Sequence, residues 1–369
     1  MDRSYFLFVR GKLDLGMINL FYSFEPKQIV SLFLVLTMLS CSFKKKIDLN
    51  DNSKKDHLMK IGFGSCLKQD KPMPVFQSIK ADNFDLFLMI GDNVYGDTQR
   101  EDLRELKLAY KQQRKNFDMM ELDFPFEAIW DDHDYGLNDA GKEYPFKDSS
   151  KELFLNFWNI PLDDSRRSQE GLYHDLVLNI GEKKLQIIFL DTRTFRDELI
   201  PTDEIGKAGK ERYIPDEDSS STILGNNQWT WLREKISLQA DFRIIVSSIQ
   251  FLALGHGWES WNNFPHERKR LINSINNSNL NHILIISGDR HRGGLYQLKT
   301  NKGKIISEMT SSSLNASFPN SEELGPLRIG SSFVEENYGS ISINSLENTL
   351  SVFLKDIRGE TLQSLLIEN

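Results

Sequence analysis

The chain has 369 residues, of which 39% are hydrophobic and 27% are charged, and its formal net charge is −8 at pH 7. This composition predicts a folded, water-soluble body. The negative charge argues against non-specific binding to nucleic acid or to anionic membranes as the main function.

The N-terminal segment departs from this soluble character. Residues 29–39 form an apolar run of signal-peptide length, too short to span a bilayer comfortably. Residues 38–41 (MLSC) resemble a bacterial lipobox, whose cysteine is acylated and becomes the first residue of the mature protein. We therefore expect residues 1–41 to be a signal and lipobox segment, with Met17 as an alternative start. An ordinary signal peptide and an uncleaved anchor are the competing interpretations.

The expected product is a lipoprotein on the periplasmic face of a bacterial membrane, at the outer membrane, held there by its N-terminal lipid. Residues 42–59 are polar without a hydrophobic period and predict a solvated tether. We expect residues 60–369 to form one catalytic domain that acts as a monomer. If Cys41 is lipidated, Cys66 has no partner in the chain, so it is either a small core residue or a metal ligand.

From Lys60 onward, apolar runs alternate with helical patterns. We predict strands over residues 61–64, 84–90, 126–130, 172–180, 185–190, 244–248, 283–287, 340–343 and 349–354. We predict helices over residues 101 to about 120, 149–158 and 226–239. The alternation indicates an α/β sheet structure with antiparallel strands late in the chain. The charged, Ser-rich residues 197–224 predict an exposed loop or lid.

Residues with ligand chemistry follow five of these strands. They are Cys66, Asp92, Asp132, Asp191 and Asp289. One such aspartate alone would more often be a turn or N-cap residue. Because functional crevices in open α/β sheets lie at the carboxyl ends of strands, the five together predict a site there.

The first motif is GDNVYGD, residues 91–97. Asp92 could bridge two cations through its two carboxylate oxygens. Tyr95 could fold back over the same centre, where a phenolate favours a trivalent ion such as Fe³⁺. A buried tyrosine hydrogen-bonded within a loop is the alternative.

Two further motifs supply histidines. Residues 130–134 (WDDHD) place Asp132 and His133 at a strand end, where adjacent acids are costly to bury without cations or a functional role. Asn138 follows with an oxygen suited to a hard cation such as Ca²⁺ or Mg²⁺. Residues 287–291 (SGDRH) direct Asp289 and His291 into the same crevice. His256, flanked by glycines, predicts a loop that faces the substrate.

Taken in order, these motifs resemble the alkaline phosphatase D (PhoD-like) family of metallophosphoesterases. The resemblance covers about residues 60–355 and rests on GSC (64–66), GDNVY (91–95), WDDHD (130–134), LDTR (190–193) with Arg196, LG (224–225) with Gln228 and WL (231–232), and GDRH (288–291). It implies a four-layer αββα sandwich. It also implies Fe³⁺ and Ca²⁺, with Mg²⁺ or another divalent ion as an alternative, and the ligands Cys66, Asp92, Tyr95, Asn138, Asp191, Asp289 and His291.

The predicted activity is metal-dependent hydrolysis of a small phosphate ester, of the alkaline phosphatase or phosphodiesterase type, by a metal-activated hydroxide. Asp132, His133 and Arg193 are the predicted catalytic residues, with Arg193 or Arg196 holding the phosphoryl oxygens. A structural ion pair with Asp191 or Asp197 is an equal alternative for these arginines. A phospholipase-like or nucleic-acid-end phosphodiesterase and a non-catalytic metal-containing lipoprotein are the competing functions. Specific nucleic-acid binding is not expected.

Overall fold

The computed structural model describes residues 57–318 and 325–368, which belong to one compact unit. The predicted signal segment (1–41) and residues 42–56 of the predicted tether lie outside the described residues. Among the residues that are described, no helix has the length and apolar character that crossing a membrane would require.

The first sheet combines a parallel half with an antiparallel half. Its order is β15-β14-β13-β1-β2-β3, and β1, β2 and β3 run parallel. The late strands pair antiparallel, and β13 joins them to β1. The strands are β1 (Leu58–Gly64), β2 (Leu86–Ile90), β3 (Phe126–Ile129), β13 (Asn337–Asn344), β14 (Thr349–Asp356) and β15 (Thr361–Glu368).

The second sheet has the order β12-β10-β11-β9-β8-β5-β4. Its centre, β11-β9-β8-β5, is parallel, while β10, β12 and β4 pair antiparallel at the two sides. The strands are β4 (His174–Ile180), β5 (Lys183–Phe189), β8 (Phe242–Ser247), β9 (His282–Ser287), β10 (Gly293–Lys299), β11 (Ile305–Ser311) and β12 (Arg328–Phe333). β11 contacts β13 and β14 of the first sheet.

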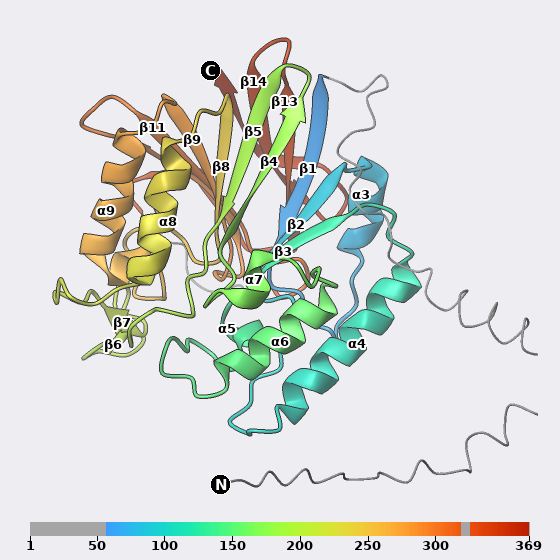
Figure 1. The fold of residues 1–369 in the computed structure, drawn as a ribbon, viewed down its shortest axis with the longest axis vertical. Coiled ribbons are helices and arrows are strands. Elements are labelled where there is room, and N and C mark those ends of the chain that lie inside the picture. The colour runs from blue at the N-terminus through green and yellow to red at the C-terminus, as the bar shows by residue number, and fades with distance from the viewer. Residues whose placement is uncertain (1–56, 319–324, 369) are drawn as a thin grey trace, which may run out of the picture. The chain divides into compact units, whose positions relative to one another are not determined.

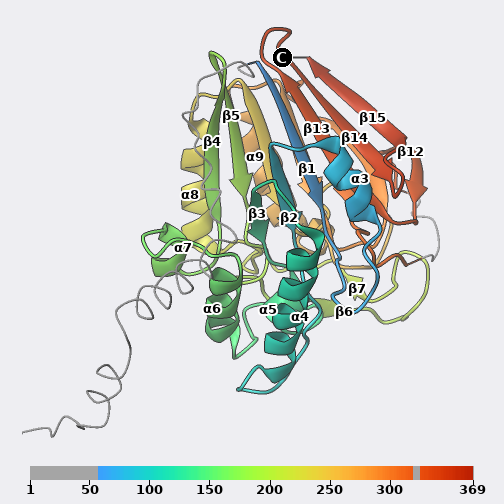
Figure 2. The same cartoon turned by 90° about the vertical axis from the view of Figure 1, so that its right-hand side faces the viewer.

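Helices cover the outer faces of both sheets, which gives the four-layer sandwich that was predicted (Figures 1 and 2). α3 (Val75–Asp82) and α4 (Arg104–Met120) pack on the first sheet, with α6 (Lys147–Phe157) against α4. α8 (Gly225–Ser237) and α9 (Pro265–Asn276) pack on the second. α4 buries Leu106, Tyr110, Gln113 and Phe117, the one-sided spacing of an amphipathic helix. The short elements are α5 (Asp132–Tyr135), α7 (Ser165–Ser168) and η1 (Trp261–Asn263).

Every strand and helix predicted from the sequence is present, with shifted ends. Apart from the short elements, the prediction omitted α3, α9, β10, β11, β12 and β15. The sequence did not predict α9 because the buried face of this helix has few apolar residues and includes the polar Glu267. The predicted loop 197–224 contains a short hairpin of β6 (Ile200–Pro201) and β7 (Tyr213–Ile214).

Candidate metal centre

Five of the predicted site residues lie shortly after parallel strands. Cys66 follows β1, Asp92 follows β2, Asp132 begins α5 after β3, and Asp289 and His291 follow β9. Four of them have left-handed backbones: φ is 59° at Cys66, 51° at Asp92, 67° at Asp289 and 52° at His291. Non-glycine residues rarely adopt this conformation, and it concentrates at functional sites.

Two glycines let the strand ends approach closely enough to form one site. A Cβ atom at Gly91, where φ is +111°, would lie 2.7 Å from Cβ of Asp131. A Cβ atom at Gly288 would lie 2.6 Å from Oγ of Ser65. Both separations are far below van der Waals contact, so the end of β2 meets that of β3, and the end of β9 meets that of β1, only because these positions lack a side chain.

The strand-end side chains form three overlapping groups. In each group, the ligand atoms of the three side chains all lie within 4.8 Å of one another. The groups are Cys66, Asp92 and His291; Asp92, Asp132 and His133; and Asp131, Asp132 and Asp289. Asp92 belongs to the first two groups and Asp132 to the last two, so each of these carboxylates could be shared by neighbouring cations.

Cys66 and Tyr95 both direct their polar atoms at Asp92. The Cys66 thiol donates to Oδ2 of Asp92 at 3.4 Å, and the Tyr95 hydroxyl donates to the same oxygen at 3.0 Å. Burial, reinforced by the Asp92 charge, raises the pKa of the thiol and of the phenol. Burial and the charge of Asp132 also raise the pKa of Asp92. Without a cation, the Cys66 thiol and the Tyr95 phenol therefore keep their protons near pH 7, and a bound metal ion would displace them.

His291 is held in the form that ligates metal. Its Nδ1 donates to the carbonyl of Ala316, and because a carbonyl only accepts, the proton is on Nδ1 and Nε2 carries the lone pair. Burial lowers the pKa of His291 to about 4, so the imidazole is neutral near pH 7. The His291 amide donates to Oγ of Ser312 at 2.8 Å, which fixes the backbone as well.

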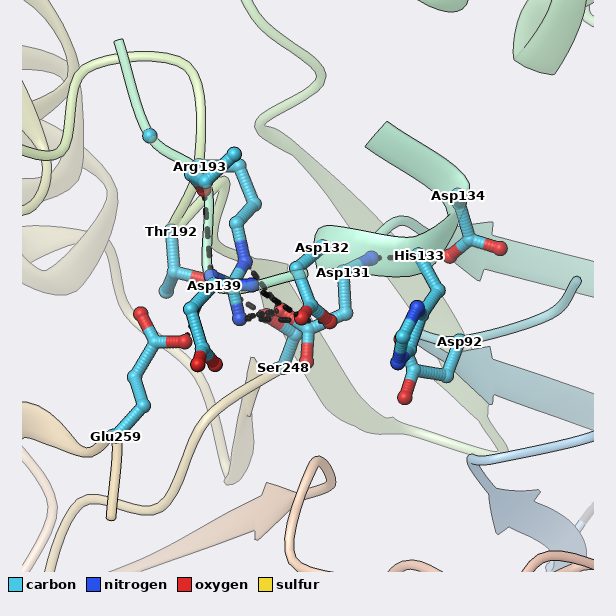
Figure 3. Close-up of polar contacts among 12 residues, drawn as sticks. Asp92, Asp131, Asp132, His133, Asp134, Asp139, Thr192, Arg193, Ser248 and Glu259 are labelled. Carbon is cyan, nitrogen blue, oxygen red and sulfur yellow. Dashed lines mark hydrogen bonds and ion pairs between the residues drawn. The ribbon is translucent and has the colours of Figure 1, made fainter. Parts of the chain in front are cut away.

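His133 is oriented by an acid and a ring. Its Nδ1 lies 2.6 Å from Oδ2 of Asp97, and its ring centroid lies 4.1 Å from that of Tyr95. Burial alone would lower the pKa of His133, but the charges of Asp132, Asp92 and Asp97 outweigh it and raise the pKa to about 11. The ring lies beside Asp92 (Figure 3).

Arg193 lies in a buried ion-pair network behind the cluster. Its side chain is fully buried; Nε donates to Oδ1 of Asp131 at 2.5 Å and Nη1 to Oε2 of Glu259 at 2.7 Å. The carboxylates of Asp131 and Asp132 face its guanidinium group (Figure 3), with Asp132 at 3.9 Å. Arg196 pairs with the other oxygen of Glu259 at 3.0 Å. This geometry favours the structural alternative for both arginines, with Asp131 and Glu259 as ion-pair partners in place of the predicted Asp191 or Asp197.

Besides Tyr95, which bonds to Asp92, two predicted ligands lie outside the three groups. Asp191 is buried, but both of its oxygens are used: Oδ1 accepts from the amides of Arg193 and Thr194, and Oδ2 accepts from the Leu172 amide and the Thr194 hydroxyl. The geometry therefore favours a loop-bracing role for Asp191. Asn138 is exposed, and its neighbour Asp139 instead donates its backbone amide to Oδ2 of Asp132 at 2.6 Å.

The donor set fits metal ions. Oδ1 of Asp92, Oδ2 of Asp131 and Oδ1 of Asp132 are buried oxygens without a hydrogen-bond donor. Such oxygens are costly to bury unless a cation or another partner satisfies them. A thiol, a phenol, a neutral imidazole and several carboxylates converge there, and this mixture of soft and hard donors suits a transition metal beside a harder ion.

Sequence reasoning missed several residues that support the site. Asp97 lay within the first motif but was not given a role. Asp134 accepts from the Val94 amide at 3.0 Å and so ties the β2 loop to α5. Glu259 lies near His256 in a loop, away from the end of any predicted strand, so the strand-end pattern did not mark it. Only the clustering of acids at 131–134 could have indicated Asp131 and Asp134 in advance.

The fold and motifs match known phosphatases. A family model described as PhoD-like phosphatase matches residues 61–348. Alkaline phosphatase D of Bacillus subtilis (strain 168) is 25% identical over 293 residues, covering 68% of this chain and 49% of that protein. The chain thus spans about half the length of this curated relative.

Solved structures share the fold at low identity. A structure of PhoD aligns with a TM-score of 0.63 at 17% identity, covering 85% of this chain and 69% of that one. GAP50, the anchor in the inner membrane complex of Plasmodium, aligns at 0.56 and 13%, covering 85% and 89%. Purple acid phosphatase PPD1 from yellow lupin seeds aligns at 0.56 and 10%, covering 84% and 54%. These likenesses establish the sandwich, not a shared activity.

Proposed function

Because the chain belongs to the PhoD-like phosphatase family, we propose that it hydrolyses phosphoric esters in a metal-dependent reaction at the strand-end cluster. The observation that carries the proposal is the set of three ligand groups joined through Asp92 and Asp132. Adjacent cations require carboxylates that two sites share and buried oxygens that accept no hydrogen bond, and the cluster has both.

The residues divide by chemistry into two parts. Cys66, Tyr95 and His291 with Asp92 would hold Fe³⁺, since thiolate and phenolate are strong donors to that ion. Asp132 and Asp289 would hold Ca²⁺, or another hard divalent ion such as Mg²⁺. Bound ions at such a site supply Lewis acidity and lower the pKa of a water molecule.

The chain's own groups would position the substrate and move a proton. His133, fixed through Nδ1 by Asp97, would present Nε2 as a donor to a phosphoryl oxygen or to the leaving oxygen. Arg193 would act indirectly, by holding Asp131 and Asp132 in register with the other ligands. The burial of Asp92, Asp131 and Asp132 would restrict water around the reacting group.

The test compares ligand variants with an exposed-acid control. Metal content and hydrolysis of mono- and diester chromogenic substrates are measured for the parent, Asp92→Asn, His291→Ala and Asp123→Asn. The first two variants are expected to lose metal and at least about 100-fold in rate, because even outer partners of metal ligands are worth 10–100-fold. Asp123→Asn, at an exposed position, is expected to match the parent. A folded, metal-loaded parent that hydrolyses neither ester class would refute the proposal and favour a non-catalytic metal protein.

We also propose export and lipid anchoring at Cys41, on the strength of the apolar run before it. Cells that express the full chain are fractionated beside cells that express Cys41→Ala. The parent is expected in the membrane fraction with a lipid mass on Cys41. An unmodified Cys41 still preceded by Ser40 would contradict the anchor.

A further inference from the structure

A row of rings runs outward from the metal ligands. The centroids of Tyr95 and His291 lie 6.3 Å apart, those of His291 and Phe318 6.5 Å apart, and those of Phe318 and Trp258 6.1 Å apart. We call Tyr95, His291, Phe318 and Trp258 the aromatic rim. Phe318 is 40% exposed although it lies beside a residue of the metal centre.

Cations lie at both ends of the aromatic rim. Nζ of Lys68 is 4.5 Å from the ring centroid of Tyr95. At the other end, Cζ of Arg212 is 5.1 Å and Cζ of Arg290 is 5.2 Å from the ring centroid of Trp258. Since the chain carries a net charge of −8, attraction for an anion must come from local cations; Arg212 is itself paired with Asp139, so Lys68 is the cation that supplies it here.

The β6–β7 hairpin fixes the outer end of the aromatic rim. The amides of Arg212 and Tyr213 both donate to the carbonyl of Gly257, at 2.9 and 2.7 Å, directly before Trp258. The Arg212 guanidinium and the Tyr213 hydroxyl each donate to Oδ2 of Asp139 at 2.7 Å. Trp258 and Arg212 are therefore held in place from two sides, as a preorganised binding wall requires.

An exposed aromatic ring is unremarkable by itself, but Phe318 continues a row of rings that begins at the metal ligands. A planar group carried by a phosphate ester would meet Phe318 and the partly exposed Trp258 once its phosphate had reached the cluster. Ring stacking tolerates any planar group, because every such group presents a π face.

We propose that the aromatic rim selects phosphate esters whose organic group is a planar ring, such as a nucleoside or aryl ester. This inference rests on the proposed function for the position of the phosphate, and it names the substrate class of that same site. Phe318 and Trp258 act as specificity-determining residues that contact the organic group, Lys68 attracts the anion, and Arg212 holds Trp258 in place.

The test measures the binding of non-hydrolysable phosphonates to the metal-loaded full chain by calorimetry. The probes are methylphosphonate, phenylphosphonate and the phosphonate analogue of thymidine 5′-monophosphate, which differ in the organic group. At least one ring-bearing probe is expected to bind about tenfold more tightly than methylphosphonate, and the tighter of the two identifies an aryl or a nucleoside group. Phe318→Ala is expected to remove most of that preference and leave methylphosphonate affinity unchanged.

Two controls separate the ring from general effects. Phe318→Tyr keeps the ring and is expected to keep the preference, whereas Leu366→Ala removes another exposed apolar side chain, on β15, and is expected to match the parent. Equal binding of all three probes, or a preference that survives Phe318→Ala, would overturn the inference. Ester hydrolysis is assayed separately, so a chain that prefers ring-bearing probes but lacks turnover refutes the proposed function alone.

Discussion

Replacing Arg193 by methionine tests whether this arginine supports the site or touches the substrate. The change keeps most of the side-chain volume but removes the charge that pairs with both Asp131 and Glu259. Arg196 still pairs with Glu259 at 3.0 Å, so Asp131 loses more of its compensating positive charge than Glu259 does. Removing one partner of a buried ion pair typically costs about 3–5 kcal/mol, because it strands an uncompensated buried charge.

The expected loss is measured by urea unfolding followed by circular dichroism, with phosphoesterase activity assayed in parallel. Arg233→Met on α8 is the matched control, because Arg233 is exposed and its change should cost less than about 0.5 kcal/mol. Activity should fall in Arg193→Met together with the midpoint of unfolding. A variant with parental stability but strongly reduced activity would refute the structural role and restore Arg193 as a substrate-binding residue.

Three further changes probe other parts of the molecule. Burial alone would raise the pKa of Glu127, but His174 and Arg166 outweigh burial and lower the pKa to about 2. The ionised Glu127 therefore stabilises the folded state at pH values above the ordinary pKa of a glutamate. That stabilisation is lost as the pH falls toward about 2, and melting curves of Glu127→Gln should show a lower Tm at neutral pH and a flatter decline in acid. Gly257→Ala would place Cβ 2.5 Å from the Glu211 amide nitrogen, so limited proteolysis should cut the β6–β7 hairpin faster; parental cleavage would show that the contact is unimportant. If Cys66 holds the proposed Fe³⁺, Cys66→Ser should lose iron, its visible absorbance and activity together, whereas retention of all three would make Cys66 a core residue only.

The sequence pointed to candidate ligands at strand ends because a buried strand ends in a recognisable way. An apolar run followed by an acid or thiol located Cys66, Asp92 and Asp289, and parallel pairing then brought β1, β2 and β3 to one edge. The same pattern marked Asp191 after β5, where neighbouring amides and a hydroxyl use both of its oxygens. A strand-end acid that binds metal and one that braces a loop differ only in which donors surround them, and those donors come from tertiary packing.

Other parts of the site had no local signal. Glu259 lies in a loop and gains its importance from Arg193, 66 positions away in the chain. Phe318 joins the aromatic rim only because β9 and the segment after β11 lie together, as the bond between Phe318 and the His291 carbonyl shows. Pairings of this kind depend on the completed sheet order and not on the spacing of residue types.

The left-handed backbones of four residues lower the stability of the fold at the positions that carry the candidate ligands. These residues are Cys66, Asp92, Asp289 and His291. Each such conformation costs roughly 1–3 kcal/mol for a non-glycine residue, and the surrounding structure must absorb that cost. Selection for thermal stability alone would therefore favour glycine at these positions and would discard the ligands. At these positions the proposed function is in tension with stability, and a stabilisation campaign on this scaffold should leave these four residues fixed.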